Sequence, residues 1–242
     1  MKDLEKYYEE NLYPLQDGVL SIVRKSGTPF FLTGGTALSR FYTHHRYSDD
    51  LDFFVANDHK YPDHVNTLLQ SFINAEPESR ITLERTSISR SKDYTQLFVI
   101  DSRNSDVELR IDLINDVAAH YGKIKKDPVL GRIDSIRNIL SNKLTALFRS
   151  EPKDVVDIHV IAKQFSCNWK EIVIEAKSKE VGIEPETVYD LLMSFPLQYL
   201  KSIKWIVRPG RDDFKREIKV IADDILFGRD NSICVFNPKN LT

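Results

Sequence analysis

Two aspartates stand one residue apart in an apolar stretch of the chain, Asp50-Leu51-Asp52-Phe53-Phe54-Val55. Successive side chains of a β-strand point to opposite faces, so a strand here places Asp50 and Asp52 on one face. A second apolar stretch, Val107 to Ile114, carries Asp112 in the same alternating pattern. The pattern predicts three carboxylates on the polar faces of two strands.

Carboxylates that gather on apolar strands repel one another, so positive charge must lie nearby. Mg²⁺ prefers oxygen ligands and leaves coordination positions for substrate phosphates. We therefore interpret Asp50, Asp52 and Asp112 as catalytic metal ligands. Two Mg²⁺ ions, or Mn²⁺ in their place, would activate an attacking hydroxyl and stabilise a leaving pyrophosphate. The plainer alternative is that the run from Ser48 to Asp50 is a solvated turn.

A glycine turn precedes the aspartates. Gly34, Gly35 and Thr36 follow a short apolar run and open a helical pattern that extends to Tyr42. Glycine lets backbone amides approach a ligand closely, and a helix N-terminus favours an anion. Thr36 could contact a phosphate or cap the helix. We expect these three residues to bind a nucleotide, although a tight strand-to-helix turn would use the same residues without a ligand.

Lys143 lies within an apolar helical stripe with spacings of four, three and four residues, formed by Ile136, Leu140, Lys143 and Leu147. A lysine is rarely buried without a partner. Asp157 lies in the next predicted helix, which is apolar nearly all round and is therefore expected to be buried. Two compatible interpretations follow: Lys143 and Asp157 form an ion pair, or both bind the nucleotide. Asp154 is expected to complement the dipole of the helix's first turn.

The predicted elements that position these residues change in kind along the chain. Strands are expected in the first half, and helices follow Gly131. This order indicates an α+β fold with a domain boundary near Asp127-Pro128, giving domains 1–130 and 131–242. The expected strands are Phe30–Leu32, Ser48–Val55, Arg80–Ser89, Tyr94–Asp101 and Val107–Ile114; the expected helices include Lys2–Lys25, Ile133–Phe148, Val155–Phe165, Trp169–Lys177, Pro185–Met193 and Phe214–Leu226.

The composition is that of an ordinary globular chain, with 41% hydrophobic and 29% charged residues. No run is long and apolar enough for a membrane span, and two cysteines without metal spacing fit a reducing, cytoplasmic setting. A net charge of -2 argues against indiscriminate nucleic-acid binding. It leaves room for a local RNA-binding surface. Two basic runs are candidates: Lys123, Lys125, Lys126 and Arg132, and Lys201, Lys204, Arg208, Arg211, Lys215 and Arg216 around Trp205.

Three further polar side chains, His44, His45 and Arg46, stand between the glycine turn and the aspartates. His44 and His45 are expected on the surface or in a loop, because no partner ligands stand at metal spacing. Arg46 could reach a phosphate or be an exposed arginine. These expectations place all three outside the protein core.

The glycine turn, the run Ser48-Asp49-Asp50-Leu51-Asp52 and the later Asp112 together resemble the DNA-polymerase-β-like nucleotidyltransferase superfamily. Within it, LTGGTALSRFYTHHRYSDDLDFF is similar to the AbiEii/AbiGii toxins, which include MenT-like toxins. The likeness continues through Asn142–Leu147 and Glu151–Asp157. The resemblance implies a polymerase-β-like domain with a mixed sheet, followed by a helical domain that completes the NTP cleft.

The resemblance also implies an activity. A metal-dependent enzyme would transfer NMP from an NTP to RNA, with the tRNA 3′ end as the expected acceptor. It would act as the toxin of a toxin–antitoxin or phage-defence system, beside a protein antitoxin. Asp50, Asp52 and Asp112 match the family's metal carboxylates. The alternatives are a nucleotidyltransferase of a small molecule such as an antibiotic, and a non-catalytic nucleotide-binding module.

Overall fold

The computed structural model describes residues 2–234 and 239–240, and it divides into two compact units. Unit 1 is built from the chain up to Ala37, Tyr47–Val117 and Ile124–Asp134. Unit 2 is built from Leu38–Arg46, Ala118–Lys123 and the chain from Ser135 onward. The chain therefore passes between the units several times, and each unit is described by itself.

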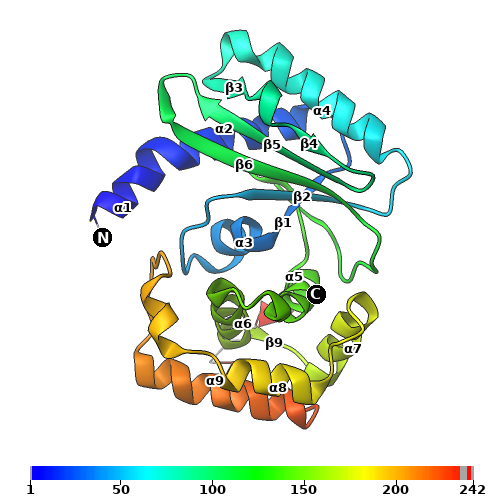
Figure 1. The fold of residues 1–242 in the computed structure, drawn as a ribbon. Helices are drawn as coiled ribbons and strands as arrows, with labels where there is room; N and C mark the ends of the chain where they lie inside the picture. Colours follow the sequence, from blue (N-terminus) through cyan, green and yellow to red (C-terminus); the bar gives the residue numbers. More distant parts are fainter. Residues whose placement is uncertain (1, 235–238, 241–242) are drawn as a thin grey trace. The chain divides into compact units, whose positions relative to one another are not determined.

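Unit 1 contains an eight-stranded mixed sheet (Figure 1). The strand order is β3-β5-β6-β2-β1-β8-β7, with β4 paired to β5. The pairs β2–β6 and β1–β8 are parallel and the other pairs are antiparallel, which confirms the expected mixed sheet. The strands are β1 (Phe31–Thr33), β2 (Leu51–Ala56), β3 (Ile81–Leu83), β4 (Ser89–Arg90), β5 (Tyr94–Asp101), β6 (Asn104–Asp116), β7 (Lys125–Asp127) and β8 (Gly131–Ile133).

Helices of unit 1 pack against this sheet through α2 and α4. The predicted N-terminal helix is present, with a π-helical segment just before Pro14, which occupies the first turn of α2 as its missing N–H allows. The helical segments are α1 (Lys2–Tyr7), η1 (Tyr8–Leu12), α2 (Tyr13–Lys25), α3 (Gly34–Ala37), α4 (Tyr61–Ala75), η3 (Glu76–Glu78) and η4 (Arg85–Ser87).

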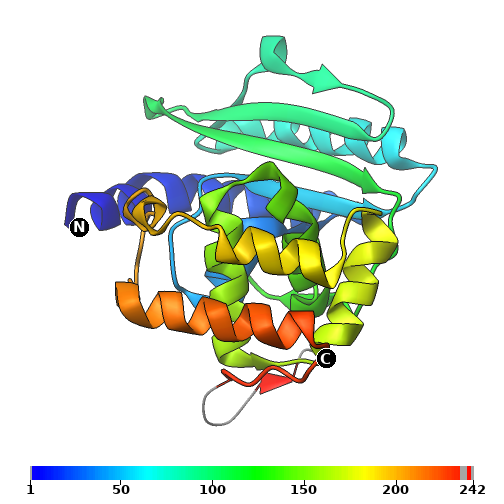
Figure 2. The ribbon, with the colours of Figure 1, turned by 60° about the horizontal axis from the view of Figure 1, so that its bottom comes forward.

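Among the described residues, unit 2 is helical apart from a two-stranded pairing and isolated bridges (Figure 2). Its apolar faces meet in a core that includes Leu140, Val156, Trp169 and Phe214. Its elements are η2 (Leu38–Thr43), α5 (Ile136–Ala146), η5 (Leu147–Arg149), α6 (Pro152–Gln164), β9 (Phe165–Ser166), α7 (Trp169–Lys179), α8 (Pro185–Met193), η6 (Leu197–Lys201), α9 (Arg211–Leu226) and β10 (Lys239–Asn240).

Local patterns predicted most elements, and two strand predictions were wrong in part. The expected strand Arg80–Ser89 ends at Leu83, because the chain turns through η4 before β4. The expected strand from Ser48 starts at Leu51 instead. No helix in the described part of the chain combines the length and apolar character that a membrane span requires.

Candidate active site

Asp52 and Asp112 lie side by side on β2 and β6, which run parallel and place the two residues in register. Alternation buries Leu51 and Phe53 on the core side of β2 and leaves Asp52 on the other face. Neighbouring strands are about 4.8 Å apart, so two carboxylates at this register are close neighbours. The structure thus brings together two of the three predicted metal carboxylates.

Asp50 precedes β2 rather than lying within it. Its backbone carbonyl accepts a hydrogen bond from the hydroxyl of Thr36, which is fully buried. In this structure Thr36 therefore fixes the main chain at Asp50. Thr36 and Asp50 are coupled although 14 residues separate them.

The N-terminal helix holds the loop that leads to Asp50. Gln16 Nε2 donates to the backbone carbonyls of Ser48 and Asp49, at 3.0 Å and 3.1 Å. The hydroxyl of Tyr8 donates to the side chain of Asp49. Burial and the neighbouring carboxylate raise the pKa of Tyr8, so it remains a donor at neutral pH. These contacts thus anchor the loop before Asp50 to the N-terminal helical segments.

Arg110 provides the positive charge that the carboxylates require. Its Nη2 lies 2.7 Å from Asp50 Oδ2, and its Nε lies 3.5 Å from Asp112 Oδ2. Arg110 stands two residues before Asp112 on β6, so both side chains project from the same face. One guanidinium therefore spans Asp50 and Asp112, and with Asp52 in register beside Asp112 all three carboxylates belong to one cluster.

Two residues of β5 hold Asp112, and no local pattern marked either of them as a site residue. Tyr94 Oη and Gln96 Nε2 both donate to Asp112 Oδ1, at 3.0 Å and 3.1 Å. Burial, together with the charge of Asp112, raises the pKa of Tyr94 to about 12, so the phenol stays protonated. Both donors bind Oδ1, which directs Oδ2 toward Arg110. Only the register of β5 against β6 reveals this arrangement.

Gly34 is required by the carboxylate beside it. Its φ is +66°, and a Cβ at this position would lie 2.2 Å from Asp52 Oδ2. A larger residue would strain the backbone and displace Asp52. Gly35 follows within α3, and both glycines are partly exposed. The glycine turn therefore shapes the site around Asp52.

The donor set suits a divalent cation in its chemistry, because three carboxylates supply the hard oxygens that Mg²⁺ prefers. Among the described residues, no three His, Cys, Asp or Glu side chains are arranged as a ready-made metal site. Arg110 neutralises Asp50 and Asp112 instead, and its side chain is 39% exposed. An ion pair this exposed is worth about 0–1 kcal/mol, so an incoming cation could displace the guanidinium at little cost.

The predicted residues Lys143 and Asp157 lie in unit 2 and contact each other. Lys143 Nζ lies 2.7 Å from Asp157 Oδ2 and also 2.7 Å from Asp154 Oδ1. Both carboxylates are fully buried. The predicted ion pair is thus present. Asp154 lies in the first turn of α6, as expected. It is also a second, buried partner of Lys143, which the local pattern did not indicate.

Arg46 and His45 complete this cluster. The expected surface position of His45 and the exposed alternative for Arg46 were both wrong, because the two side chains are buried. Arg46 binds Asp157 through two hydrogen bonds of 2.7 Å and 2.8 Å, and His45 Nε2 lies 2.9 Å from Asp157 Oδ1. Burial alone would raise the pKa of Asp157, but Arg46 and Lys143 outweigh it and hold that pKa well below its usual range. Burial lowers the pKa of His45, so the ring is neutral and Nε2–H donates to the carboxylate.

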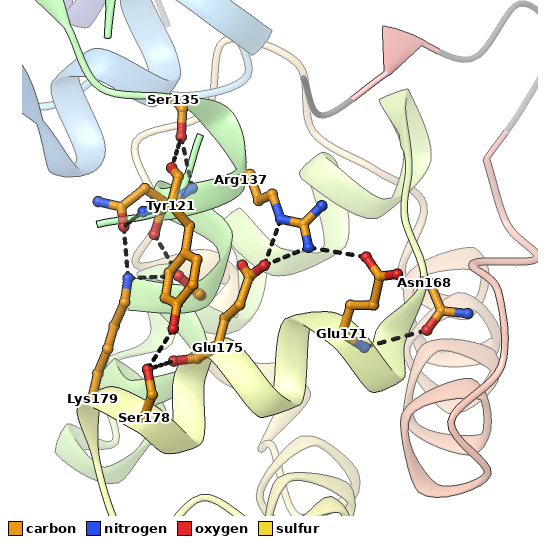
Figure 3. A network of polar contacts seen from close by, with 10 residues as sticks. Tyr121, Ser135, Arg137, Asn168, Glu171, Glu175, Ser178 and Lys179 are labelled. Atoms are coloured by element: carbon orange, nitrogen blue, oxygen red, sulfur yellow. Dashed lines mark hydrogen bonds and ion pairs between the residues drawn. The ribbon is translucent and has the colours of Figure 1, made fainter. Parts of the chain in front are cut away.

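Polar contacts at the N-terminus of α5 and between α5 and α7 fix the helix that carries Lys143; Figure 3 shows this network. Ser135 caps its N-terminus by accepting from the amide of Asn138. Lys179 Nζ donates to three side-chain oxygens of α5 at 2.7 Å each. Arg137 reaches α7 through Glu175 and Glu171. These contacts tie α5 to α7 and hold Lys143 in place along the helix axis.

Comparison with known proteins identifies one matching family model and several similar solved structures. A family model described as "Nucleotidyl transferase AbiEii toxin, Type IV TA system" matches residues 21–230. No curated protein matches. The solved structures with the same fold include the following three. A putative nucleotidyltransferase from H. pylori has TM-score 0.59 and 20% identity, covering 90% of this chain and 96% of that chain. JHP933 from Helicobacter pylori has TM-score 0.56 and 18% identity, covering 94% and 93%. MenT4, a nucleotidyltransferase toxin from Mycobacterium tuberculosis H37Rv, has TM-score 0.54 and 12% identity, covering 87% and 81%.

Proposed function

The chain belongs to the AbiEii family of nucleotidyl transferase toxins, and from that premise we propose that it transfers NMP from an NTP to RNA. The observation that carries the proposal is the register of Asp52 against Asp112, with Asp50 joined to the pair through Arg110. Two carboxylates on adjacent parallel strands and a third beside them match what phosphoryl transfer with divalent cations requires.

The reaction exchanges one phosphorus–oxygen bond for another. The acceptor hydroxyl oxygen attacks the α-phosphorus of the NTP, the bond to the bridging oxygen of the β-phosphate breaks, and pyrophosphate leaves with the electron pair. Mg²⁺ or Mn²⁺ held by Asp50, Asp52 and Asp112 would stabilise the developing charge and assist loss of the hydroxyl proton. Tyr94 and Gln96 keep Asp112 oriented with Oδ2 available.

Lys143 and Asp157 have a proposed nucleotide-binding role that is compatible with their ion pair. An ammonium group has three N–H donors, and Lys143 uses two of them on Asp154 and Asp157. Among the described residues the third has no acceptor, so it can serve a phosphate oxygen. Asp157 then orients Lys143. Within unit 1, the partly exposed Gly34 and Gly35 are proposed to bind phosphate through their backbone amides, and Thr36 supports this turn through its hydrogen bond to Asp50.

The family description names a toxin of a toxin–antitoxin system, so we propose an antitoxin partner and a cytoplasmic site of action. The tRNA 3′ end is the proposed acceptor, because it offers free hydroxyl groups on an exposed single strand. No observation favours a small-molecule acceptor, and family membership argues against a non-catalytic module.

The acceptor class can be tested directly. The purified protein is incubated with Mg²⁺ and each of the four α-³²P-labelled NTPs, in one arm with total tRNA and in the other with a panel of aminoglycosides. Label in tRNA that is lost after treatment with a 3′ exonuclease supports the proposal. Label in a small molecule, with none in tRNA, would reject the RNA acceptor.

A further inference from the structure

One stretch of unit 2 is rich in basic residues, although the chain as a whole is slightly acidic. Residues 199–216, here called the basic segment, contain six basic and two acidic residues, whereas the chain has a net charge of -2. The segment includes the end of η6, the connection that follows and the start of α9. Figure 2 shows this connection between the yellow α8 and the orange α9.

Most of these cations are free to bind a ligand. Lys201, Arg208, Arg211 and Lys215 are exposed, and none of the four makes a side-chain hydrogen bond or ion pair with another described residue. Arg216 differs, because it pairs with Asp213 at 2.6 Å. A ligand that binds the four cations therefore breaks no existing ion pair.

The basic segment is held in a fixed conformation. Trp205 is buried and its indole Nε1 donates to the carbonyl of Leu200 at 2.7 Å, so it is unavailable for stacking on a base. The backbone amides of Ile206 and Val207 donate to the carbonyl of His45, at 3.0 Å and 3.1 Å. The cations thus project from an anchored backbone, which lowers the entropy lost on binding.

The anchor point connects the segment to the Lys143 cluster. The carbonyl of His45 accepts the two backbone hydrogen bonds of the basic segment. The ring of His45 contacts Asp157, the partner of Lys143. The neighbouring Arg46 forms a β-bridge with Trp205 and also binds Asp157. Within unit 2, the basic segment therefore adjoins the residues proposed to bind the nucleotide.

We propose that the basic segment binds the sugar–phosphate backbone of the acceptor RNA. The free cations would contact successive phosphates, and Tyr199, which is 44% exposed, would stack on an unpaired base in place of the buried Trp205. The four cations follow one another from the end of η6 through the connection into the start of α9, and such a row suits a linear polyanion. This inference rests on the proposed RNA acceptor.

Charge reversal at three free cations tests the proposal. One variant carries Lys201→Glu, Arg208→Glu and Lys215→Glu. The matched control carries Lys123→Glu, Lys126→Glu and Arg132→Glu, which reverse three exposed cations of the other basic run. Fluorescence anisotropy with labelled tRNA gives Kd at several salt concentrations, and transfer of labelled NTP gives kcat and KM. Thermal melting confirms that both variants are folded.

We expect the basic-segment variant to bind tRNA at least about tenfold more weakly, with KM for tRNA raised in parallel. Its slope of log K against log salt should be shallower by about 2, because each phosphate contact contributes about 0.7 to the slope for a single strand. NTP affinity and kcat at saturating tRNA should not change. The control should remain within about twofold of the wild type in Kd.

Three results would overturn the proposal: unchanged tRNA binding in the basic-segment variant, an equal loss in the control, or competition by polyglutamate as effective as that by RNA. Failure of the proposed function looks different. If the wild type binds tRNA through the segment but labels no RNA, the transferase proposal fails and the binding surface stands. If the wild type labels tRNA and the variant binds it normally, the surface proposal fails alone.

Discussion

Replacement of Lys143 by Met tests the buried charge cluster of unit 2, because Met keeps the length of the side chain and removes the ammonium. Lys143 Nζ lies 2.7 Å from one oxygen of Asp154 and 2.7 Å from one oxygen of Asp157. Asp157 keeps Arg46 and His45 after the substitution. Most of the cost therefore falls on Asp154.

The size of that cost follows from what Asp154 retains. Its remaining ion-pair partner among the described residues is Arg149 at 3.4 Å, whose side chain is 65% exposed and contributes little. A fully buried carboxylate that loses its main partner costs about 3–5 kcal/mol. Because domains are stable by only about 5–15 kcal/mol, Lys143→Met should lose a large share of the free energy of unfolding.

Urea denaturation followed by circular dichroism measures this loss at pH 7. The double variant Lys143→Met/Asp154→Asn removes both charges and should regain at least about 1 kcal/mol, since no unpaired charge remains. A loss below about 1 kcal/mol for Lys143→Met, or no recovery in the double variant, would refute the reasoning. If the double variant is stable, a reduced NTP affinity by calorimetry isolates the nucleotide-binding role of Lys143.

Three further outcomes are expected. Gly34→Ala should lower transfer at least about 100-fold, because its Cβ displaces Asp52; Gly27→Ala is the control, with φ +70° and nothing within 4 Å, and equal activity of the two variants would contradict the clash. Tyr94→Phe removes a donor to the third carboxylate and should lower kcat about tenfold with KM for NTP little changed, so a normal kcat would exclude a positioning role. Despite burial, neighbouring cations hold the pKa of Asp157 well below its usual range. The stability that Asp157 contributes is therefore complete above the unfolded pKa of about 4 and is lost as pH falls toward the folded pKa. Urea denaturation from pH 5 to pH 2 should show that the free energy of unfolding falls less steeply with pH in Asp157→Asn than in the wild type. The same pH dependence in both proteins would contradict this.

The carboxylate strands could be predicted because their signal is local. Leu51, Phe53 and Val55 alternate with polar positions, and this period places Asp52 on the open face without knowledge of the fold. Val107 to Ile114 gives the same information for Asp112. The alternation could not supply the register between strands, which is a property of the sheet. It also overestimated the length of β2, which starts at Leu51. The backbone carbonyl of Asp50 bonds to the side chain of Thr36 and not to a neighbouring strand.

The partners of these residues could not be predicted, because they come from distant parts of the chain. Arg46 and Asp157 are separated by 111 residues, and no local pattern joins them. Tyr94 and Gln96 have the pattern of ordinary strand residues in the sequence, and only the pairing of β5 with β6 brings them to Asp112. The burial of Trp205 could not be predicted either. It stands within a basic run that is a candidate RNA-binding surface, but its indole is buried and bonds to the carbonyl of Leu200.

The most direct test of the transferase site is Asp52→Asn, which removes one charge and keeps the shape of the side chain. Label from an α-³²P-NTP is followed into tRNA with Mg²⁺ present, and Asp106→Asn on the same sheet, an exposed position, is the control. The wild type and the control should label tRNA equally, and Asp52→Asn should be slower by more than about 100-fold, because even outer-shell changes at metal sites cost 10–100-fold. Equal labelling by Asp52→Asn, or no labelling by the wild type with any of the four NTPs, would contradict the assignment of this site.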